Sequence, residues 1–284
     1  MSGHDSETVM QPGNPDRYVL SRSQEERQRL VLQDELLGSM TRSLFQRAGL
    51  REGSRVLDVG SGVGGVALLA CDIVGTSGSV VGVEIDAESA AVAVQRCAVA
   101  GVSKVTFLVD DVATATLPGP FDAVVGRLVL MHLQDPIAIL ARLRAMLRPN
   151  GIVAFLEGIM AAPRLSQPRS QSLEELERVR LRAVGRVPAN LLMGLDLRRV
   201  FLHAGLGEPH LSAEALIGGG PGWPGFNLIE ETLRSVAETW SRAGVEGADQ
   251  IVVDGLAERI EREVGDEGTV LMQPHVGAWA RVSR

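Results

Sequence analysis

The chain has 284 residues, 45% of them hydrophobic, which is enough to bury a full core, and its formal net charge is −7. A negative protein repels a polyanion, so the composition argues against nucleic acid as a partner. No apolar run approaches the roughly 18 residues of a membrane span, and the start of the chain is polar, so we expect a cytoplasmic protein without membrane contact. Cys71 and Cys97 lack metal-ligand partners at useful spacing, so we expect two reduced thiols and no metal.

The first half of the chain alternates strand-like and helical patterns. After a predicted disordered tail, apolar residues recur at helical spacing over 24–45, which predicts one or two amphipathic helices. The predicted strands that follow are 55–59, 79–84, 104–109, 121–126 and 151–157, and the predicted helices between them are 63–74, 87–100 and 136–147. This order predicts a parallel, doubly wound α/β sheet with helices on both faces.

The second half is less regular. A polar, proline-bearing segment at 160–188 becomes helical, a sheet-packing helix is predicted at 196–206, and a β-like run lies near 208–217. A glycine-rich loop at 218–225 precedes two further helical patterns, and a strand pattern near 269–281 closes the sequence. We interpret one group of alternating charges as solvated helix faces, namely Glu174, Glu175, Glu177, Arg178, Arg180 and Arg182.

These patterns predict a core interrupted by helical additions that form a cap over one end of the sheet. The predicted parts are a disordered tail (1–17), an N-terminal helical lid (18–50), an α/β ligand-binding core (51–160), a helical insertion (161–190), a continuation of the core (191–217), a second helical insertion (218–267) and a final core strand (268–284).

The most informative stretch is V-L-D-V-G-S-G-V-G-G at 56–65. Gly60, Gly62 and Gly65 satisfy G-x-G-x-x-G, and an acid follows about 20 residues later, so a dinucleotide fingerprint is formally present. Asp58 argues against a dinucleotide, because its carboxylate would add negative charge beside a pyrophosphate. S-adenosylmethionine, whose amino-acid end carries an ammonium group, suits this carboxylate better.

The ends of successive strands supply further polar residues, and ligands of open α/β sheets bind beyond these ends. Glycines after the first strand let a ligand approach the backbone, at Gly60, Gly62 and Gly64. Glu84 ends the second strand, where its carboxylate could accept hydrogen bonds from both ribose hydroxyls. Asp110 and Asp111 end the third strand and could accept from an adenine amino group, and Arg127 ends the fourth, under the methionine portion.

This series resembles the class I S-adenosylmethionine-dependent methyltransferases, in V-L-D-V-G-S-G-V-G, V-V-G-V-E-I-D, F-L-V-D-D-V and L-R-P-N-G-I-V-A-F. The segments 18–33 and 276–281 are similar to a bacterial group that acts on small molecules, as in secondary metabolism. The resemblance implies a seven-stranded Rossmann-like sheet with S-adenosylmethionine as cofactor. It favours Asp111 over Asp110 for adenine, and it adds to the implied cofactor site Tyr18, Gln33, Asp58, Ser61, Ile85 and Val112. Many relatives carry cysteine in place of Ser61.

The acceptor end is less clear in the sequence. His132 follows the fourth strand and could act as a general base, or it could be a hydrogen-bonded structural histidine. Met131, Trp223 and Phe226 are candidates for an acceptor pocket, whereas we assign Trp240 to core packing. Arg127 could instead be a surface ion-pair residue.

We therefore expect a methyltransferase that acts on a small-molecule acceptor at oxygen, nitrogen or carbon, with a homodimer as one possible assembly. A nucleic-acid methyltransferase is disfavoured, because the fourth strand ends in G-R-L-V-L-M-H without the D/N-P-P-Y/F signature. A nicotinamide-dependent oxidoreductase conflicts with Asp58. A protein that binds the cofactor without transferring its methyl group remains an alternative, since fold does not determine the reaction.

Overall fold

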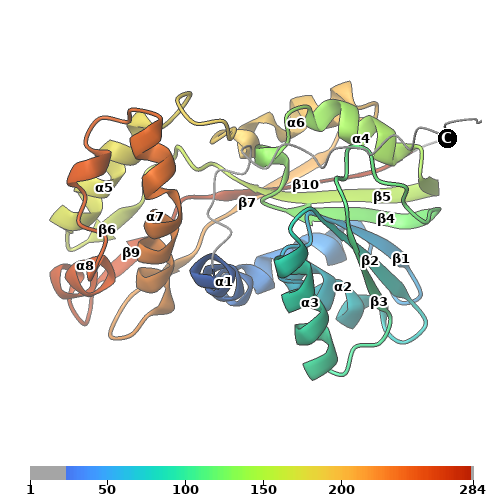
Figure 1. The fold of residues 1–284 in the computed structure, drawn as a ribbon, viewed down its shortest axis with the longest axis horizontal. Helices are drawn as coiled ribbons and strands as arrows, with labels where there is room; N and C mark the ends of the chain where they lie inside the picture. Colours follow the sequence, from blue (N-terminus) through green and yellow to red (C-terminus); the bar gives the residue numbers. More distant parts are fainter. Residues whose placement is uncertain (1–23, 283–284) are drawn as a thin grey trace, which may run out of the picture.

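The computed structural model describes residues 24–282, which form a mixed central sheet with a smaller unit at one end (Figure 1). The order of strands in the central sheet is β3 (Val105–Val109), β2 (Ser79–Glu84), β1 (Arg55–Val59), β4 (Phe121–Arg127), β5 (Leu147–Gly158), β10 (His275–Arg281) and β7 (His210–Glu214). The predicted seven-stranded, doubly wound sheet is thereby confirmed. It is not wholly parallel, because β10 runs antiparallel to both β5 and β7.

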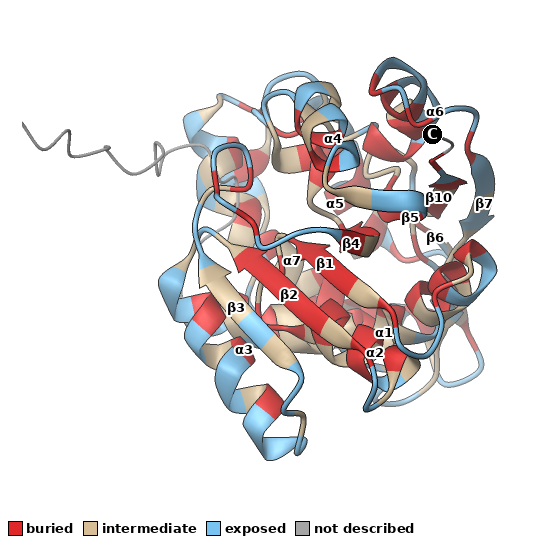
Figure 2. Ribbon diagram, turned by 90° about the vertical axis from the view of Figure 1, so that its right-hand side faces the viewer, coloured by how far each residue is buried: buried red, intermediate tan, exposed pale blue. Residues whose placement is uncertain are grey.

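Helices cover both faces of this sheet (Figure 1). One face carries α1 (Gln24–Ala48), α2 (Gly65–Val74) and α3 (Ala87–Val99), and the other carries α4 (Pro136–Arg144) and α6 (Met193–His203). Side-chain caps define two helix starts, since Asp86 accepts from the Ser89 N–H and Asp135 from the Ala138 N–H. The strands β1 and β2 are almost wholly buried, whereas the edge strand β3 is partly exposed (Figure 2).

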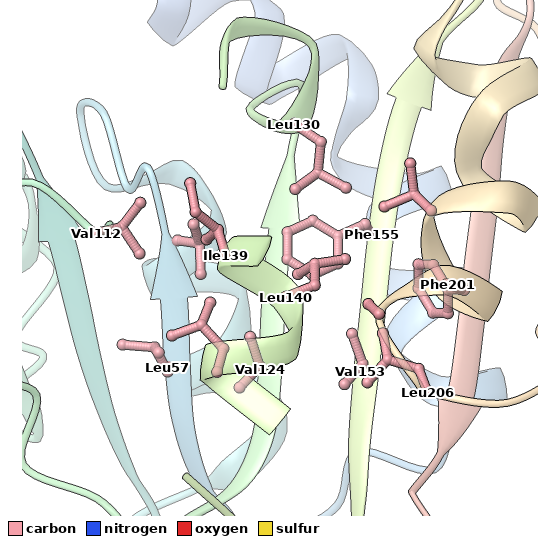
Figure 3. Packing of buried hydrophobic residues seen from close by; sticks show 14 of the residues in the cluster. Leu57, Val112, Val124, Leu130, Ile139, Leu140, Val153, Phe155, Phe201 and Leu206 are labelled. Atoms are coloured by element: carbon pink, nitrogen blue, oxygen red, sulfur yellow. The ribbon is translucent and has the colours of Figure 1, made fainter. Parts of the chain in front are cut away.

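The period of two along the strands divides the core between the two faces. Leu57, Val124 and Phe155 pack toward α4 and α6, where Phe201 and Leu140 complete the cluster (Figure 3). Their sequence neighbours on the strands pack against α1 and α2, at Val56, Val125 and Ala154. The strands β1, β4 and β5 are therefore hydrophobic on both sides, as expected for strands between two helical layers.

The cap has a core of its own, built on the helices α5 (Gln171–Arg182), α7 (Pro224–Arg242) and α8 (Leu256–Val264). It also contains a three-stranded antiparallel sheet, β6–β9–β8, which the sequence analysis did not predict. Its strands are β6 (Leu165–Gln167), β9 (Thr269–Leu271) and β8 (Ile217–Gly218). The pairing joins three segments that lie far apart in the chain, so local periodicity carries no sign of it.

Element boundaries differ from the predictions in four places. The helix α1 is continuous over 25 residues, and α4 ends at Arg144 because β5 already begins at Leu147. The strand pattern near 269–281 is two strands in different sheets, and Pro274, which has no N–H to donate, lies between them. Likewise the run near 208–217 divides between β7 and β8. Two short 3₁₀ turns also occur within residues 24–282, η2 (Leu130–His132) and η3 (Ala248–Gln250).

Candidate functional site

One cavity of about 680 Å³ connects the carboxyl ends of the strands with the interior of the cap. The strand ends and the loops after them contribute Gly60, Gly62, Val83, Glu84, Ile85, Asp110, Asp111, Val112, Arg127, Met131 and His132. The helix α1 contributes Glu26, Arg27, Arg29, Leu30 and Gln33. The cap side is lined by Met160, Arg164, Leu176, Arg180, Val187, Ala189, Leu191, Leu228, Thr232, Leu233, Val236, Trp240, Met272 and Gln273.

The glycine-rich turn between β1 and α2 brings backbone to the cavity wall. Gly60 has φ +63°, and a Cβ atom there would lie 2.4 Å from Val129 Cγ2, so only glycine fits. Gly62 lines the cavity beside it, but Gly64 does not. It precedes α2 and packs against Ala93, so its place in the structure is helix packing rather than the cavity wall.

Glu84 is held by backbone donors at the end of β2. Its Oε2 accepts from the Gly62 N–H at 2.8 Å, and its Oε1 accepts from the Asp86 N–H at 2.9 Å. Burial raises the pKa of Glu84 above its usual value, although both hydrogen bonds oppose that shift. The carboxylate is thus oriented before any ligand binds, and the neighbouring Ile85 is 41% exposed at the cavity edge.

The end of β3 places both candidate aspartates at the cavity. Asp110 accepts from the Asp111 N–H at 2.8 Å, and Asp111 accepts from the Ala113 N–H at 2.9 Å. Val112 beside them is buried and also lines the cavity. The choice between the two aspartates therefore stays a prediction.

Arg127 at the end of β4 is buried and paired with the helix α1. It contacts the carboxylate of Asp34 and donates to Thr41 Oγ1 at 3.2 Å. The other oxygen of Asp34 accepts from Arg96 of α3 at 2.7 Å. The surface ion-pair alternative for Arg127 is therefore wrong, since this arginine is buried and lines the cavity.

Asp58 and Ser61 lie beside the turn but do not line the cavity in the part of the chain that the structure describes. Both carboxylate oxygens of Asp58 are buried, and neither has a hydrogen-bond partner of normal geometry. The backbone N–H of Ala67 is nevertheless close enough to act against a rise in the pKa of Asp58. Burial raises the pKa of Asp58 well above its usual value, and the nearby Arg127 opposes this. Direct contact of Asp58 with a ligand in the cavity would need a local rearrangement.

The two cofactor-site predictions in the N-terminal part of the chain, Gln33 and Tyr18, have different outcomes. Gln33 lines the cavity and accepts a hydrogen bond from Arg29 at 2.8 Å, as one of several polar side chains on this helix. Tyr18 lies outside the described residues. The buried pair of Arg29 and Glu26, which the sequence analysis missed, lies on the same wall, and Ser235 of α7 donates to Glu26 at 2.6 Å.

Met131 and His132 belong to the turn that follows β4. Glu157 of β5 orients this turn, because its Oε1 accepts from the N–H groups of Val129 and Leu130 at 2.9 and 2.8 Å. Burial lowers the pKa of His132 to about 4, and the charge of Arg29 adds to that effect. The His132 side chain is only partly buried, and it lines the cavity. It is therefore neutral at physiological pH.

We expect His132 and the buried His275, whose pKa burial also lowers to about 4, to remain neutral in the folded protein down to about pH 4. The unfolded chain takes up these protons near pH 6.5, so the two histidines contribute stability that is present above pH 6.5 and is lost as the pH falls toward 4. Ring-proton NMR from pH 4 to 8, with His132→Gln for assignment, measures this. A His132 signal with a midpoint near 6.5 would contradict the expectation.

The aromatic residues divide differently from the prediction. Trp223 and Phe226 contact each other edge to face, with ring centroids 5.2 Å apart, and neither lines the cavity. Phe226 is 2% exposed in the cap core, and Trp223 packs over Gly218 and Gly225, so their assignment to an acceptor pocket is corrected. Trp240 lines the cavity from α7 in addition to packing in the core.

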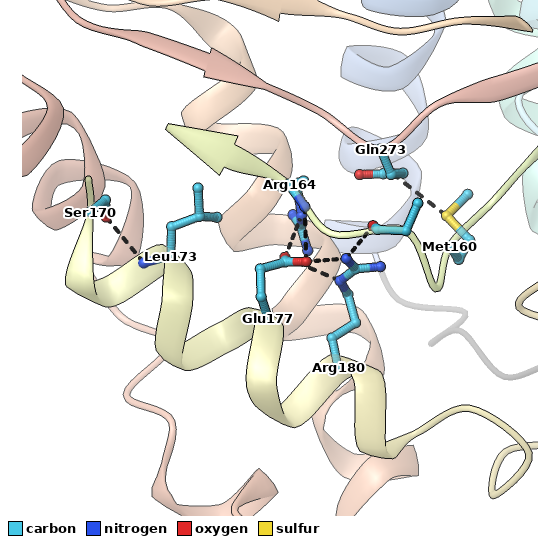
Figure 4. Close-up of polar contacts among 8 residues, drawn as sticks. Met160, Arg164, Ser170, Leu173, Glu177, Arg180 and Gln273 are labelled. Atoms are coloured by element: carbon cyan, nitrogen blue, oxygen red, sulfur yellow. Dashed lines mark hydrogen bonds and ion pairs between the residues drawn. The ribbon is translucent and has the colours of Figure 1, made fainter. Parts of the chain in front are cut away.

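A buried ionic cluster in the cap corrects the interpretation of α5 as uniformly solvated. Glu177 and Arg180 are buried, and Glu177 contacts both Arg180 and Arg164 (Figure 4). Arg178 on the same helix is exposed. Helical spacing could have revealed this, because Glu177 and Arg180 lie four and seven residues after the buried Leu173.

The structure describes potential metal ligands, cysteines and long apolar helices only for residues 24–282. Within residues 24–282 no group of three or more His, Cys, Asp or Glu side chains could hold a metal ion. Cys71 and Cys97 are buried and free. No helix in the same range is long and apolar enough to cross a membrane.

Comparison with known proteins matches residues 25–207 to a family described as a methyltransferase domain. An arsenite methyltransferase of Aquipseudomonas alcaligenes is 35% identical over 114 residues, covering 37% of this chain and 33% of the relative. Nocamycin O-methyltransferase of Saccharothrix syringae is 31% identical over 134 residues, covering 47% and 48%. The chain thus spans between a third and half of the length of these curated relatives.

Among solved structures, phosphoethanolamine N-methyltransferase 2 of Haemonchus contortus, in complex with phosphomonomethylethanolamine and S-adenosylhomocysteine, superimposes with a TM-score of 0.55. The match covers 94% of this chain and 60% of the other at 20% identity, so it supports the fold alone.

Proposed function

Since this chain belongs to the methyltransferase domain family, we propose that it transfers a methyl group from S-adenosylmethionine to a small-molecule acceptor. The observation that carries the proposal is the single cavity that joins the glycine-rich turn and the strand-end carboxylates to an apolar chamber in the cap. Such a cavity can hold a nucleoside donor and an acceptor end to end.

The cofactor roles follow from the positions of the strand ends. We assign the ribose hydroxyls to Glu84, the adenine amino group to Asp111 and close backbone approach to Gly60 and Gly62. Gln33 and Arg127 lie where the methionine end would extend. Ile85 and Val112 supply apolar surface beside the base.

The protein's own contribution to the reaction is placement and desolvation. Bound S-adenosylmethionine supplies a methyl group on a sulfonium, which is already activated toward an in-line nucleophile. Met131 and His132 lie between the cofactor end and the cap, where an acceptor would be aligned. Neutral His132 can accept a hydrogen bond from an acceptor hydroxyl. Because the pKa of His132 is low, the histidine would pass on a proton from the acceptor rather than retain it.

Calorimetry with S-adenosylhomocysteine and, separately, with NAD tests the proposal. We expect one site for S-adenosylhomocysteine and none for NAD; binding of NAD alone would overturn the proposal. Formation of S-adenosylhomocysteine from S-adenosylmethionine, measured against a panel of hydroxyl, amine and carbon acceptors, then tests transfer.

Other parts of the function stay predictions. A net charge of −7 favours a small molecule over nucleic acid as the acceptor. Homodimer formation and a cytoplasmic location are hypotheses that sedimentation and cell fractionation address.

A further inference from the structure

Two arginines in the cap share one carboxylate. Arg164 donates to Glu177 from its backbone N–H at 3.0 Å and from its Nε at 2.8 Å. Arg180 donates to the same carboxylate from Nε at 3.1 Å and from Nη2, which also donates to the Ala162 carbonyl at 2.6 Å. All three ionic side chains are buried, and Figure 4 shows them converging from α5 and from the segment that precedes β6.

The cluster therefore carries one positive charge in excess. Burial lowers the pKa of Arg164 to about 10, which still leaves it charged at neutral pH, while the arginines hold the pKa of Glu177 below its usual value. A buried charge without a partner of opposite sign is unfavourable in a medium of low dielectric constant. Among residues 24–282, the acceptors that bind the two guanidinium groups are the Glu177 carboxylate and the Ala162 carbonyl.

The uncommitted donors belong to residues of the cavity wall. Within the described chain, neither terminal nitrogen of Arg164 nor Nη1 of Arg180 has a hydrogen-bond partner, and both residues line the cavity. Gln273 lies beside them, and its buried Oε1 has no partner, while its amide nitrogen contacts only the Met160 sulfur at 3.5 Å (Figure 4).

The rest of this chamber is largely apolar. Its lining includes Leu176, Val187, Leu228, Leu233, Val236 and Trp240. A ligand here meets hydrocarbon and aromatic surface over most of the wall, and outside the arginine pair the polar side chains of the cap side are Thr232 and Gln273. The low local dielectric constant strengthens the attraction of the pair for an anion.

We propose that Arg164 and Arg180 form an anion-binding subsite and that the methyl acceptor is an apolar molecule with one monoanionic group, such as a carboxylate. A monoanion neutralises the excess charge of the cluster, whereas a dianion leaves a buried negative charge. The inference rests on the proposed function only in taking the chamber as the place of the acceptor.

The test uses three naphthalene probes that differ in charge: 2-naphthoate, its neutral methyl ester and 2-naphthyl phosphate. Binding is measured by calorimetry at pH 7.5 on the full chain saturated with S-adenosylhomocysteine. We expect 2-naphthoate to bind at least about tenfold more tightly than the ester, the gain of a charge-assisted hydrogen bond. It should also bind more tightly than the phosphate.

Four single variants locate the effect. Arg164→Gln and Arg180→Gln each leave a neutral arginine–glutamate pair, so they should fold and lose the preference for 2-naphthoate, with unchanged affinity for the ester. Arg178→Gln, on the exposed side of the same helix, should keep the preference. Glu177→Gln raises the excess to two positive charges and should shift the preference toward the phosphate.

The subsite is overturned if wild type does not distinguish 2-naphthoate from its ester, or if the arginine variants keep the preference. If the wild type binds 2-naphthyl phosphate more tightly than 2-naphthoate, the subsite prefers a dianion. That result would contradict the proposed excess of one positive charge. Affinity for S-adenosylhomocysteine, measured in a separate titration of the ligand-free protein, reports on the proposed function, and the probe titrations are repeated on that ligand-free protein. Absence of that affinity would leave the anion result standing.

Discussion

Asp34→Ala is expected to lower the free energy of unfolding by about 3 kcal/mol, because it breaks a buried ion pair and leaves one charge uncompensated. Asp34 joins Arg127 at the end of β4 to Arg96 on α3, and its own side chain is only 12% exposed. Arg96 also donates to the Val63 carbonyl in the glycine-rich turn at 2.7 Å. The carboxylate therefore anchors α1 against the turn, and denaturant unfolding followed by circular dichroism measures the loss.

Asp72→Ala provides the matched control. Asp72 forms an ion pair with Arg42 of α1 at 2.7 Å, but both side chains are largely exposed. We expect this variant to change the free energy of unfolding by no more than about 0.5 kcal/mol. Equal effects of the two substitutions would show that burial of Asp34 does not matter.

Glu84→Ala is expected to weaken binding of S-adenosylhomocysteine about 100-fold, the equivalent of losing two hydrogen bonds to a charged acceptor. The substitution removes the group proposed to accept the ribose hydroxyls. It also releases the backbone N–H groups of Gly62 and Asp86, so the turn loses its orientation. Calorimetric titration gives the dissociation constant directly.

The control for Glu84 is Glu208→Ala, which removes an exposed carboxylate paired with Arg198 away from the cavity wall. It should leave the affinity for S-adenosylhomocysteine unchanged. A decrease of less than threefold in the Glu84 variant would contradict the proposed ribose contact.

The strand-end residues that line the cavity could be predicted because their positions are local in sequence. The five parallel strands are short hydrophobic runs, and their carboxyl ends lie at one edge of the sheet whatever the rest of the chain does. Glu84, Asp111 and Arg127 are each at such an end and line the cavity. Asp58 is also at a strand end, yet it is buried behind the turn, since its position along the strand does not reveal how the turn folds over it.

The acceptor end could be predicted only in part. Trp223 was expected in the pocket because it lies in a glycine- and proline-rich loop, but the loop folds its ring back over Gly218 and Gly225. Arg180 was expected in solvent because charges alternate along α5. The face that a helix buries depends on what packs against it, and here that partner is the remainder of the cap.

Local sequence patterns were enough to predict the doubly wound sheet, the glycine-rich turn and the strand-end carboxylates. These features depend on the periodicity and spacing of residues within a few tens of positions, so they do not require knowledge of distant segments. Tertiary structure alone decided that β6, β8 and β9 pair into a second sheet and that Arg164, Arg180 and Trp240 share one chamber. Those contacts join segments that are distant in sequence and become neighbours only in the folded protein, so no local pattern predicts them.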